Sequence, residues 1–233
     1  AWPVHIFDSI DSTNAEALRL IEAGCTAPFL VLSEQQTAGR GRRGRKWVSP
    51  FAQNVYYSLV LRIDGGMRQL EGLSLVVGLA VMQALRDAGV RSAGLKWPND
   101  VLVEKKKIAG ILLELIGDPA DVCHVVLGIG INVNMQKADE VDQQWTSVYL
   151  ETGGAVDRNY LVARLGVQLQ AYLDRHQSSG FSSIQSEWEQ SHLWQGRPVS
   201  LIAGVNQIDG VVLGIDGQGA LRLSVNGVEK VYR

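Results

Sequence analysis

The most unusual segment of the sequence is the loop Gly39–Trp47, in which glycines alternate with five cationic side chains. Glycine lets backbone amides approach a ligand closely, and guanidinium groups make charge-assisted hydrogen bonds to phosphate oxygens. The loop therefore suits a polyphosphate, although it lacks the Gly-x-x-x-x-Gly-Lys-Ser/Thr spacing of a Walker A loop. When this segment is taken alone, a solvated loop and an RGG-like nucleic-acid contact remain open as alternatives.

A second segment, Lys96–Asp100, carries polar side chains just after a short apolar run. Pro98 lacks an N–H donor and forces the residue before it into an extended conformation, so a strand must end there. Asn99 and Asp100 then stand at a strand exit, where a carboxylate beside cations can hold Mg²⁺ or orient a nucleophile. An ordinary Asn-Asp turn is the alternative.

A third segment places three consecutive lysines, residues 105 to 107, before an apolar strand. A charged hairpin tip explains the first two. Lys107 adjoins the strand, and the small residues Ala109 and Gly110 leave room for a ligand beside it. We therefore expect Lys107, alone among the three, to point into a pocket.

A fourth segment has two glycines two positions apart, Gly128 and Gly130, within an apolar run. They resemble the beginning of a dinucleotide-binding fingerprint, but the third glycine and the following helix are missing. We interpret them as opening one face of a strand for a flat ligand. Close packing of a helix on the strand is the alternative.

The elements that must position these segments can be read from hydrophobic periodicity. A helix is expected between Thr13, its N-cap, and Gly24, with Glu16 completing a capping box. Alternation predicts strands at 30–33, 55–63, 94–97, 101–103, 108–116 and 122–131, and helices are expected at 70–88, 159–175 and 181–190. Short runs at 199–202, 207–213 and 220–225 predict a small β-barrel or sandwich.

The composition excludes several classes of protein. The 233 residues include 22 Lys and Arg against 24 Asp and Glu, and this net charge of -2 does not suit a general nucleic-acid binder. The sequence has neither a signal-peptide start nor a run of about 18 apolar residues, so a cytoplasmic protein that does not enter a membrane is expected. Cys25 and Cys123 lie outside any Cys/His cluster and are expected to be two buried thiols.

Five motifs in this order resemble the biotin protein ligase family. They are Ser12-Thr13-Asn14, Glu34-x-Gln36-Thr37-x-Gly39-Arg40-Gly41-Arg42, Lys96-Trp97-Pro98-Asn99-Asp100, Lys107-x-Ala109-Gly110-Ile111-Leu112 and Gly128-x-Gly130-Ile131-Asn132. Each motif is weak alone, but all five in the family's order and spacing are a specific signal. The resemblance spans essentially the whole chain and extends to a C-terminal module that begins at Arg197.

The resemblance implies an α+β fold in which a central mixed β-sheet is flanked by helices, as in class II aminoacyl-tRNA synthetases and biotin and lipoate ligases. A catalytic domain that binds biotin and ATP would span residues 1–192, and an SH3-like β-barrel would span residues 193–233. The family usually continues through a Gly-Gly-Glu segment, so the barrel is expected to lack its last strand. This chain starts too late for the helix-turn-helix repressor domain of many bacterial members, and no DNA binding is expected.

The implied activity is that of an ATP-dependent biotin protein ligase. It activates biotin with ATP to biotinyl-5′-AMP and pyrophosphate, and then transfers biotin to a lysine of the biotin carboxyl carrier protein of acetyl-CoA carboxylase. ATP and Mg²⁺ would be co-substrates, with no tightly bound prosthetic group. A homodimer through an exposed edge strand of the central sheet is expected. The rival functions are a lipoate or octanoate protein ligase or transferase and a nucleic-acid-binding module.

Matching positions in the family imply roles for individual residues. Biotin would contact Ser12, Thr13, Asn14, Gln36, Arg40, Gly41, Arg42, Lys107, Gly110, Leu112 and Gly128. The nucleotide would contact Arg45, Lys96, Asn99, Asn132 and Trp145. Arg42 and Lys107 would stabilise the pentacovalent phosphorus, and Asp100 would act on the metal ion or on the acceptor lysine.

Overall fold

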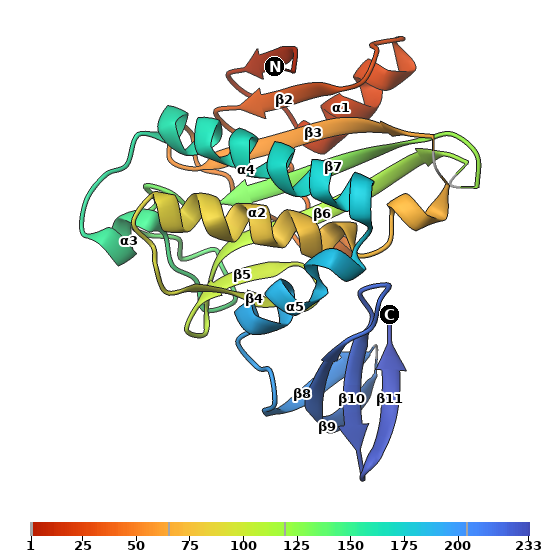
Figure 1. Ribbon diagram of the computed structural model, residues 1–233. Coiled ribbons are helices and arrows are strands. Elements are labelled where there is room, and N and C mark those ends of the chain that lie inside the picture. Colours follow the sequence, from red (N-terminus) through yellow and green to blue (C-terminus); the bar gives the residue numbers. More distant parts are fainter. Residues whose placement is uncertain (1, 65, 119, 204) are drawn as a thin grey trace.

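A mixed sheet of seven strands forms the centre of the molecule (Figure 1). The computed structural model describes residues 2–64, 66–118, 120–203 and 205–233. The strand order is β1-β2-β3-β7-β6-β5-β4, with β1 parallel to β2 and the other neighbours antiparallel. The strands are β1 Val4–Phe7, β2 Phe29–Ser33, β3 Val55–Ile63, β4 Ala93–Lys96, β5 Asp100–Val103, β6 Lys106–Gly117 and β7 Cys123–Ile131. The predicted central mixed sheet is therefore confirmed.

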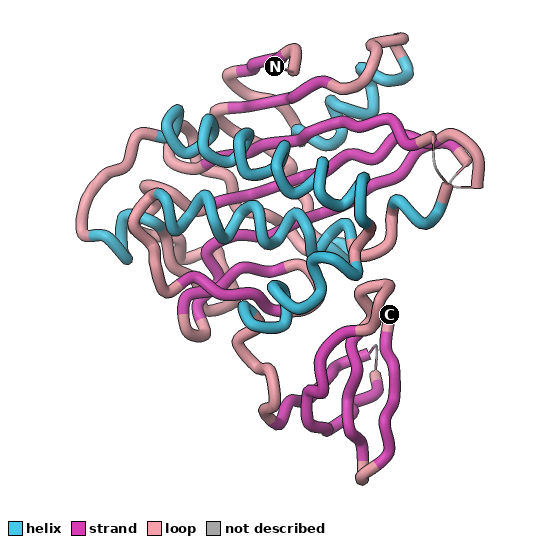
Figure 2. Tube along the Cα trace, viewed as in Figure 1, coloured by secondary structure: helices cyan, strands magenta, loops and turns pink. Residues whose placement is uncertain are grey.

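Helices cover both faces of this sheet (Figures 1 and 2). The helices are α1 Thr13–Glu22, α2 Leu73–Asp87, α3 Val148–Thr152, α4 Arg158–Ser179 and α5 Ser182–Ser191. Leu30 of β2 belongs to the core under α2 and α4, whereas Val31 belongs to the core under α1. Since side chains alternate across a strand, α1 lies on the face opposite to α2 and α4. No helix in the described part of the chain has the length and apolarity to cross a membrane.

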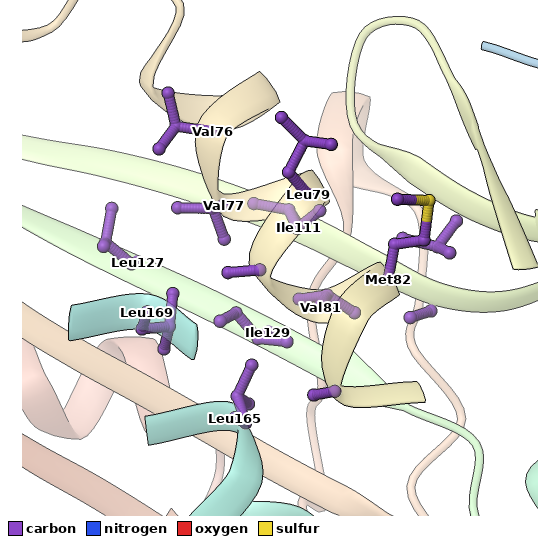
Figure 3. Packing of buried hydrophobic residues seen from close by; sticks show 14 of the residues in the cluster. Val76, Val77, Leu79, Val81, Met82, Ile111, Leu127, Ile129, Leu165 and Leu169 are labelled. Atoms are coloured by element: carbon purple, nitrogen blue, oxygen red, sulfur yellow. The ribbon is translucent and has the colours of Figure 1, made fainter. Parts of the chain in front are cut away.

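The largest core lies between α2, α4 and the middle of the sheet (Figure 3). Val77 and Val81 of α2 pack with Ile129 of β7 and with Leu165 and Leu169 of α4. All of these side chains are buried, and burying one such side chain contributes about 1.5–3 kcal/mol. This core fixes the position of β7.

The register of β7 determines which residues reach the opposite face. Gly128 lies across from Ser58 of β3, and Gly130 lies across from Gly110 of β6. Ile129, between the two glycines, faces the α2 core. The glycines therefore lie on the face that α1 covers.

A second sheet of four antiparallel strands follows α5, in the order β11-β10-β9-β8. Its strands are β8 Pro198–Ala203, β9 Asn206–Ile215, β10 Leu221–Val225 and β11 Val228–Tyr232. Its own buried core consists of Val212, Leu221 and Leu223, on which Trp97 packs. Trp97 also donates from Nε1 to Gly219 O at 3.0 Å, so the two sheets are joined by packing and by a hydrogen bond.

Two local expectations were wrong. Ser12, not Thr13, is the N-cap of α1, because its backbone is extended and its Oγ accepts from Ala15 N. Glu16 pairs with Arg19 instead of closing a capping box. Cys25 is only half-buried, whereas Cys123 is buried as expected.

Three elements were not expected from the sequence: β1, α3 and β11. All three are short, with four or five residues each, and a run of this length gives only a weak periodic signal that is easily missed. Edge strands such as β1 and β11 also expose much of their surface, so they need not alternate. The other expected helices and strands are confirmed, with ends shifted by a few residues.

His192 lies at the junction between α5 and the second sheet, and its ring stacks on Trp188 with centroids 4.7 Å apart. Burial lowers the pKa of His192 from 6.5 to about 4. The folded protein therefore keeps this ring neutral at pH 5, while the unfolded chain protonates it. The stability that depends on the neutral ring is complete above about pH 6.5 and decreases as the pH falls toward 4.

We predict that His192→Gln removes this sensitivity to acid. Urea titrations at pH 7 and pH 5 would give the free energy of unfolding of both proteins. Between these pH values the wild type should lose up to about 2 kcal/mol more than the variant. An identical pH dependence in the two proteins would contradict the prediction.

Candidate active site

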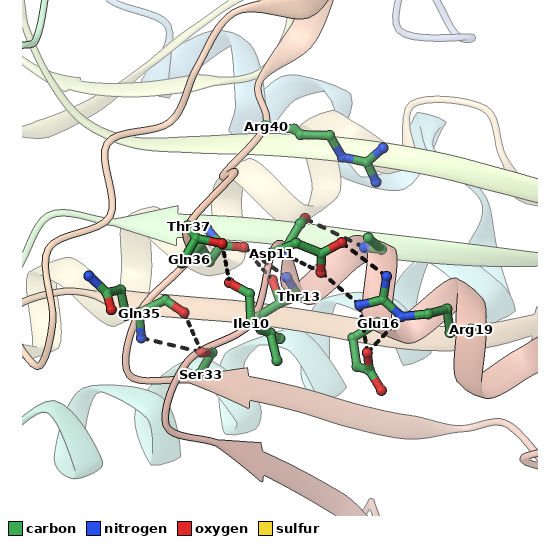
Figure 4. A network of polar contacts seen from close by, with 12 residues as sticks. Ile10, Asp11, Thr13, Glu16, Arg19, Ser33, Gln35, Gln36, Thr37 and Arg40 are labelled. Atoms are coloured by element: carbon green, nitrogen blue, oxygen red, sulfur yellow. Dashed lines mark hydrogen bonds and ion pairs between the residues drawn. The ribbon is translucent and has the colours of Figure 1, made fainter.

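The first turn of α1 carries polar side chains to the glycine-bearing face of the sheet. Ser12 caps the helix, and Thr13 and Asn14 are buried in its first turn. Asp11 fixes this turn by accepting hydrogen bonds of 2.7 and 3.0 Å from Arg19 and one of 2.7 Å from Ser12 N (Figure 4). The hydrogen bonds from Arg19 are the main reason that the pKa of Asp11 is lowered to about 2. The helix start is therefore held in one orientation at neutral pH.

Thr13 and Asn14 belong to a buried polar network. Gln36 Oε1 accepts from Thr13 N at 2.8 Å and from Thr13 Oγ1 at 3.1 Å (Figure 4). Ser58 Oγ lies 2.6 Å from Asn14 Oδ1 and 2.8 Å from Thr13 Oγ1. The network connects α1, the segment after β2 and the middle of β3.

The glycines of β6 and β7 make room for the protein's own side chains. A Cβ at Gly128 would lie 2.2 Å from Asn14 Oδ1, and a Cβ at Gly130 would lie 2.4 Å from the Trp47 ring. A Cβ at Gly110 would lie 3.2 Å from the same ring. Asn14 and Trp47 therefore occupy part of the space above these glycines, and the expectation that a flat ligand binds on this strand face stays a prediction.

Lys107 points into the site as expected. Its Nζ pairs with Asp100 Oδ1 at 2.7 Å, and the two side chains are only 16% and 18% exposed. Nζ also lies 5.4 Å from the centroid of the Trp47 ring, within the range of a cation–π contact. Lys105 and Lys106 are exposed. The prediction that Lys107 alone enters a pocket is confirmed.

The backbone of Lys107 anchors the segment that carries Trp145. Lys107 N donates to Gln144 O at 3.0 Å, and Lys107 O accepts from Thr146 N at 2.9 Å. The β5–β6 pairing is interrupted by a register shift at this point, and such bulges redirect side chains. Asn132 is buried and donates from Nδ2 to Thr146 O at 3.0 Å. Trp145 is thus held beside Lys107.

The cationic loop reaches the exit of β4 through Arg42. Its Nη1 donates to Asn99 Oδ1 at 3.2 Å, and Asn99 Nδ2 donates to Ile111 O at 2.7 Å. Desolvation, with a contribution from neighbouring Arg43, lowers the pKa of Arg42 from its ordinary value. Arginine nevertheless stays protonated in proteins, so Arg42 brings a positive charge to the point where the cationic loop meets the exit of β4.

Two adjoining cavities run among these side chains. The inner pocket, of about 50 Å³, is lined by every residue expected to bind biotin: Ser12, Thr13, Asn14, Gln36, Arg40, Gly41, Arg42, Lys107, Gly110, Leu112 and Gly128. The outer pocket, of about 460 Å³, is lined by Asp100 and by every residue expected to bind the nucleotide: Arg45, Lys96, Asn99, Asn132 and Trp145. Arg42 and Lys107 line both pockets and mark where they meet.

The side chains near Asp100 fit a metal ion that arrives with a phosphate ligand. Asp100 offers one carboxylate, and the described residues hold no group of three His, Cys, Asp or Glu that could form a metal site. Mg²⁺ bound with nucleotides commonly takes one or two carboxylates and completes its shell with water and phosphate oxygens. Asp100 would be the protein ligand in such an arrangement.

Known proteins are similar to this chain over most of its length. The model of the biotin/lipoate A/B protein ligase family matches residues 6–132, more than half of the chain. The chain is 43% identical over 222 residues to the biotin--[acetyl-CoA-carboxylase] ligase of Paracoccus denitrificans, covering 91% of this chain and 90% of that protein. The chain belongs to the biotin/lipoate A/B protein ligase family. It is also 41% identical over 231 residues to the bifunctional ligase/repressor BirA of Escherichia coli (strain K12), covering 98% of this chain and 71% of that protein.

A solved structure shows that this member of the biotin/lipoate A/B protein ligase family shares its fold with a biotin protein ligase. The biotin protein ligase from Aquifex aeolicus in complex with biotin and ATP matches with a TM-score of 0.85 at 29% identity. The match covers 98% of this chain and 94% of that chain. It therefore includes both the central sheet and the second sheet.

Several residues of the site were missed in the sequence. Trp47 lines both pockets, and Ser58 supports Asn14 from β3. Ser58 is a polar residue within a fully buried strand, which is a signal that could have identified it. Ile202 and Tyr232 of the second sheet also line the outer pocket. Their place in the lining of the outer pocket depends on how the two sheets pack, so no local sequence pattern could have identified them.

We predict that Gly128→Ala destabilises the protein by about 1–3 kcal/mol, because the added methyl group overlaps Asn14 Oδ1. Urea denaturation measures the change. Gly166→Ala in α4 is the matched control, since a Cβ there meets open space and alanine favours helix, so it should stabilise by up to about 1 kcal/mol. Wild-type stability of the Gly128 variant would show that Asn14 does not need this space.

Proposed function

We propose that this chain is an ATP-dependent biotin protein ligase. It activates biotin as biotinyl-5′-AMP with release of pyrophosphate, and then transfers biotin to a lysine of an acceptor protein. The observation that carries the proposal is the meeting of the inner and outer pockets at Arg42 and Lys107. Homologues named as biotin ligases, and solved biotin protein ligases holding biotin and ATP, support it.

In the inner pocket, the protein offers biotin a polar end and a cationic end. Ser12, Thr13, Asn14 and Gln36 supply hydroxyl and amide groups for a ureido ring, and Leu112 supplies an apolar wall. Binding sites of this kind combine an apolar lining with a few converging polar groups. The carboxylate end of biotin would then lie toward Lys107 and Arg42. Arg45, Lys96, Asn99, Asn132 and Trp145 would hold the nucleotide in the outer pocket.

The first step is an attack of the biotin carboxylate on the α-phosphorus of ATP, with pyrophosphate as the leaving group. Negative charge builds up on the α-phosphoryl oxygens in the transition state. Arg42 and Lys107 lie where this charge develops, and preorganised cations in a partly desolvated site stabilise it strongly. Asp100 would be the protein ligand of a Mg²⁺ ion bound with ATP, and such an ion would supply positive charge for the leaving pyrophosphate.

The second step is an attack of the acceptor lysine amine on the carbonyl carbon of the mixed anhydride, with AMP as the leaving group. The amine attacks in its neutral form, and the proton that it loses as the amide forms passes to solvent water. Asp100 is the carboxylate at the junction of the pockets, and we assign to it the orientation of this amine. No covalent bond between biotin and the enzyme is required.

The assembly of the protein is part of the same proposal. The acceptor is the biotin carboxyl carrier protein, as the name of the Paracoccus relative suggests. β5 pairs with β6 only as far as Gly110, and the remainder of β6 is a sheet edge in the described structure through which two copies would dimerise.

We place the domain boundary between residues 192 and 193, and the second sheet is an SH3-like barrel. The cytoplasmic location and the lack of DNA binding stay predictions.

We predict that the purified chain exchanges labelled pyrophosphate into ATP only when biotin, ATP and Mg²⁺ are all present. A carboxylate attacks a phosphoryl centre only when their mutual repulsion is screened. Lipoate in place of biotin is the control, and it should give background exchange. Exchange at equal rates without biotin would remove the ligase function, and exchange with lipoate alone would favour the lipoate branch of the family.

We further predict that Lys107→Ala lowers the rate of exchange roughly 10²- to 10³-fold, because a positive charge at the transition state is lost. Lys106→Ala is the matched control, since Lys106 is exposed and lines neither pocket. Steady-state exchange at saturating substrates measures both. If the two variants behave alike, Lys107 does not act on the reacting phosphoryl group.

A further inference from the structure

Glu114 is a carboxylate that contacts both the first turn of α1 and the cationic loop. It lies on β6, and its side chain is only 27% exposed. Its Oε2 accepts a hydrogen bond of 2.7 Å from Asn14 Nδ2 and one of 3.1 Å from Arg40 Nη2. One oxygen atom therefore joins the first turn of α1 to the cationic loop, which are far apart in the sequence.

The contact with Glu114 fixes the orientation of the Asn14 amide group, that is, the directions in which its oxygen and its nitrogen face. Ser58 carries one hydroxyl proton, and Asn14 Oδ1 can only accept, so Ser58 donates to Asn14 across their 2.6 Å contact. The amide nitrogen must then face acceptors, and it finds Glu114 Oε2 and Leu112 O. Asn14 Oδ1 is thus held beside Gly128, with one lone pair still available to a ligand N–H group.

The contact with Arg40 fixes the loop. Arg40 lines the inner pocket, whereas the neighbouring residues Arg43, Gly44 and Lys46 do not. The backbones of Arg40 and Lys46 pair in an isolated antiparallel β-bridge at the base of the loop. The contact between Arg40 and Glu114 therefore limits the movement of the whole turn between these two residues. A half-buried carboxylate that pairs with one cation and one amide is satisfied only while the loop lies over the pocket.

We infer that Glu114 is a positioning residue that couples the polar end of the inner pocket to closure of the cationic loop. This inference rests on the proposed function. Glu114 keeps Asn14 turned as an acceptor for the N–H groups of the ureido ring, and the same oxygen holds Arg40 over the bound ring. It takes no part in the phosphoryl chemistry, which occurs at Arg42 and Lys107. Its loss should therefore weaken retention of biotin and leave the chemical step intact.

The test uses the variants Glu114→Ala, Glu114→Gln, Arg40→Gln and the double variant Glu114→Gln/Arg40→Gln in biotin-dependent pyrophosphate exchange. Glu114→Ala should raise KM for biotin roughly 10- to 100-fold, the usual cost of losing hydrogen bonds to a charged group, with kcat within about twofold of wild type. Glu114→Gln, which keeps an acceptor for Asn14, should show a smaller rise. The double variant should resemble the worse single variant. A fall in kcat at constant KM, or single effects that multiply in the double variant, would overturn the inference.

A second readout does not depend on catalysis. Limited trypsin digestion of the ligand-free proteins should cleave after Arg42, Arg43 and Arg45 several-fold faster in Glu114→Ala than in wild type, because the tether is gone. Glu229→Gln, which breaks a two-point arginine pair in the second sheet, is the matched control and should digest like wild type. Equal digestion of wild type and Glu114→Ala would overturn the inference.

The two readouts also separate this inference from the proposed function. If wild type shows no biotin-dependent exchange, the proposed function fails while the digestion still tests the tether. If wild type exchanges normally and Glu114→Ala matches it in both assays, the inference alone fails. A thermal melt of each variant confirms that it is folded before it is assayed.

Discussion

The site depends on one constraint, which is the absence of side chains at three glycine positions on one face of β7 and its neighbour β6. Gly128 leaves space for Asn14, and Gly130 and Gly110 leave space for Trp47. Glycine within a strand costs stability, because it loses more backbone entropy on folding and packs no side chain. The apolar residues between the glycines offset this cost on the other face, where Ile129 packs under α2. A shift of one residue in the register of β7 would exchange the two faces and remove both the core and the site.

Each of the three cationic side chains that line the inner pocket has a partner within the protein. Lys107 pairs with Asp100, Arg40 pairs with Glu114, and Arg42 donates to Asn99. Placing positive charge in a partly desolvated pocket is costly unless it has a partner. These partners keep the cations in place without a ligand and can be exchanged for the more negative phosphates of a bound nucleotide. The cationic loop can therefore stay folded against the sheet.

Much of the fold was predictable because its long elements have clear periodicity. α2 and α4, and the long strands β3, β6 and β7, could be recognised from their apolar patterns alone. The residues of the inner pocket were also predictable, because the five short motifs contain nearly all of the residues that line it, whereas they contain fewer than half of those that line the outer pocket. The sequence did not show which residues each motif contacts in the folded protein. Whether Ser12 or Thr13 caps α1, and whether Gly128 faces a ligand or Asn14, depends on tertiary packing, which a single sequence does not display. Glu114 was overlooked for the same reason, since a glutamate on a strand usually faces solvent.

The hydrogen bond between Trp97 and Gly219 bears on the cooperativity of folding. Among the described residues, the separate core cluster of the second sheet holds three buried side chains, which is little apolar surface to offset the conformational entropy of ordering four strands. Trp97, from the segment that carries Asn99 and Asp100, supplies part of the missing apolar surface. The second sheet and the exit of β4 should therefore unfold as a single unit, and amide protons in both should exchange with solvent through the same opening event. In this sense the second sheet is a structural extension of the active site, because it packs on the segment that carries Asn99 and Asp100.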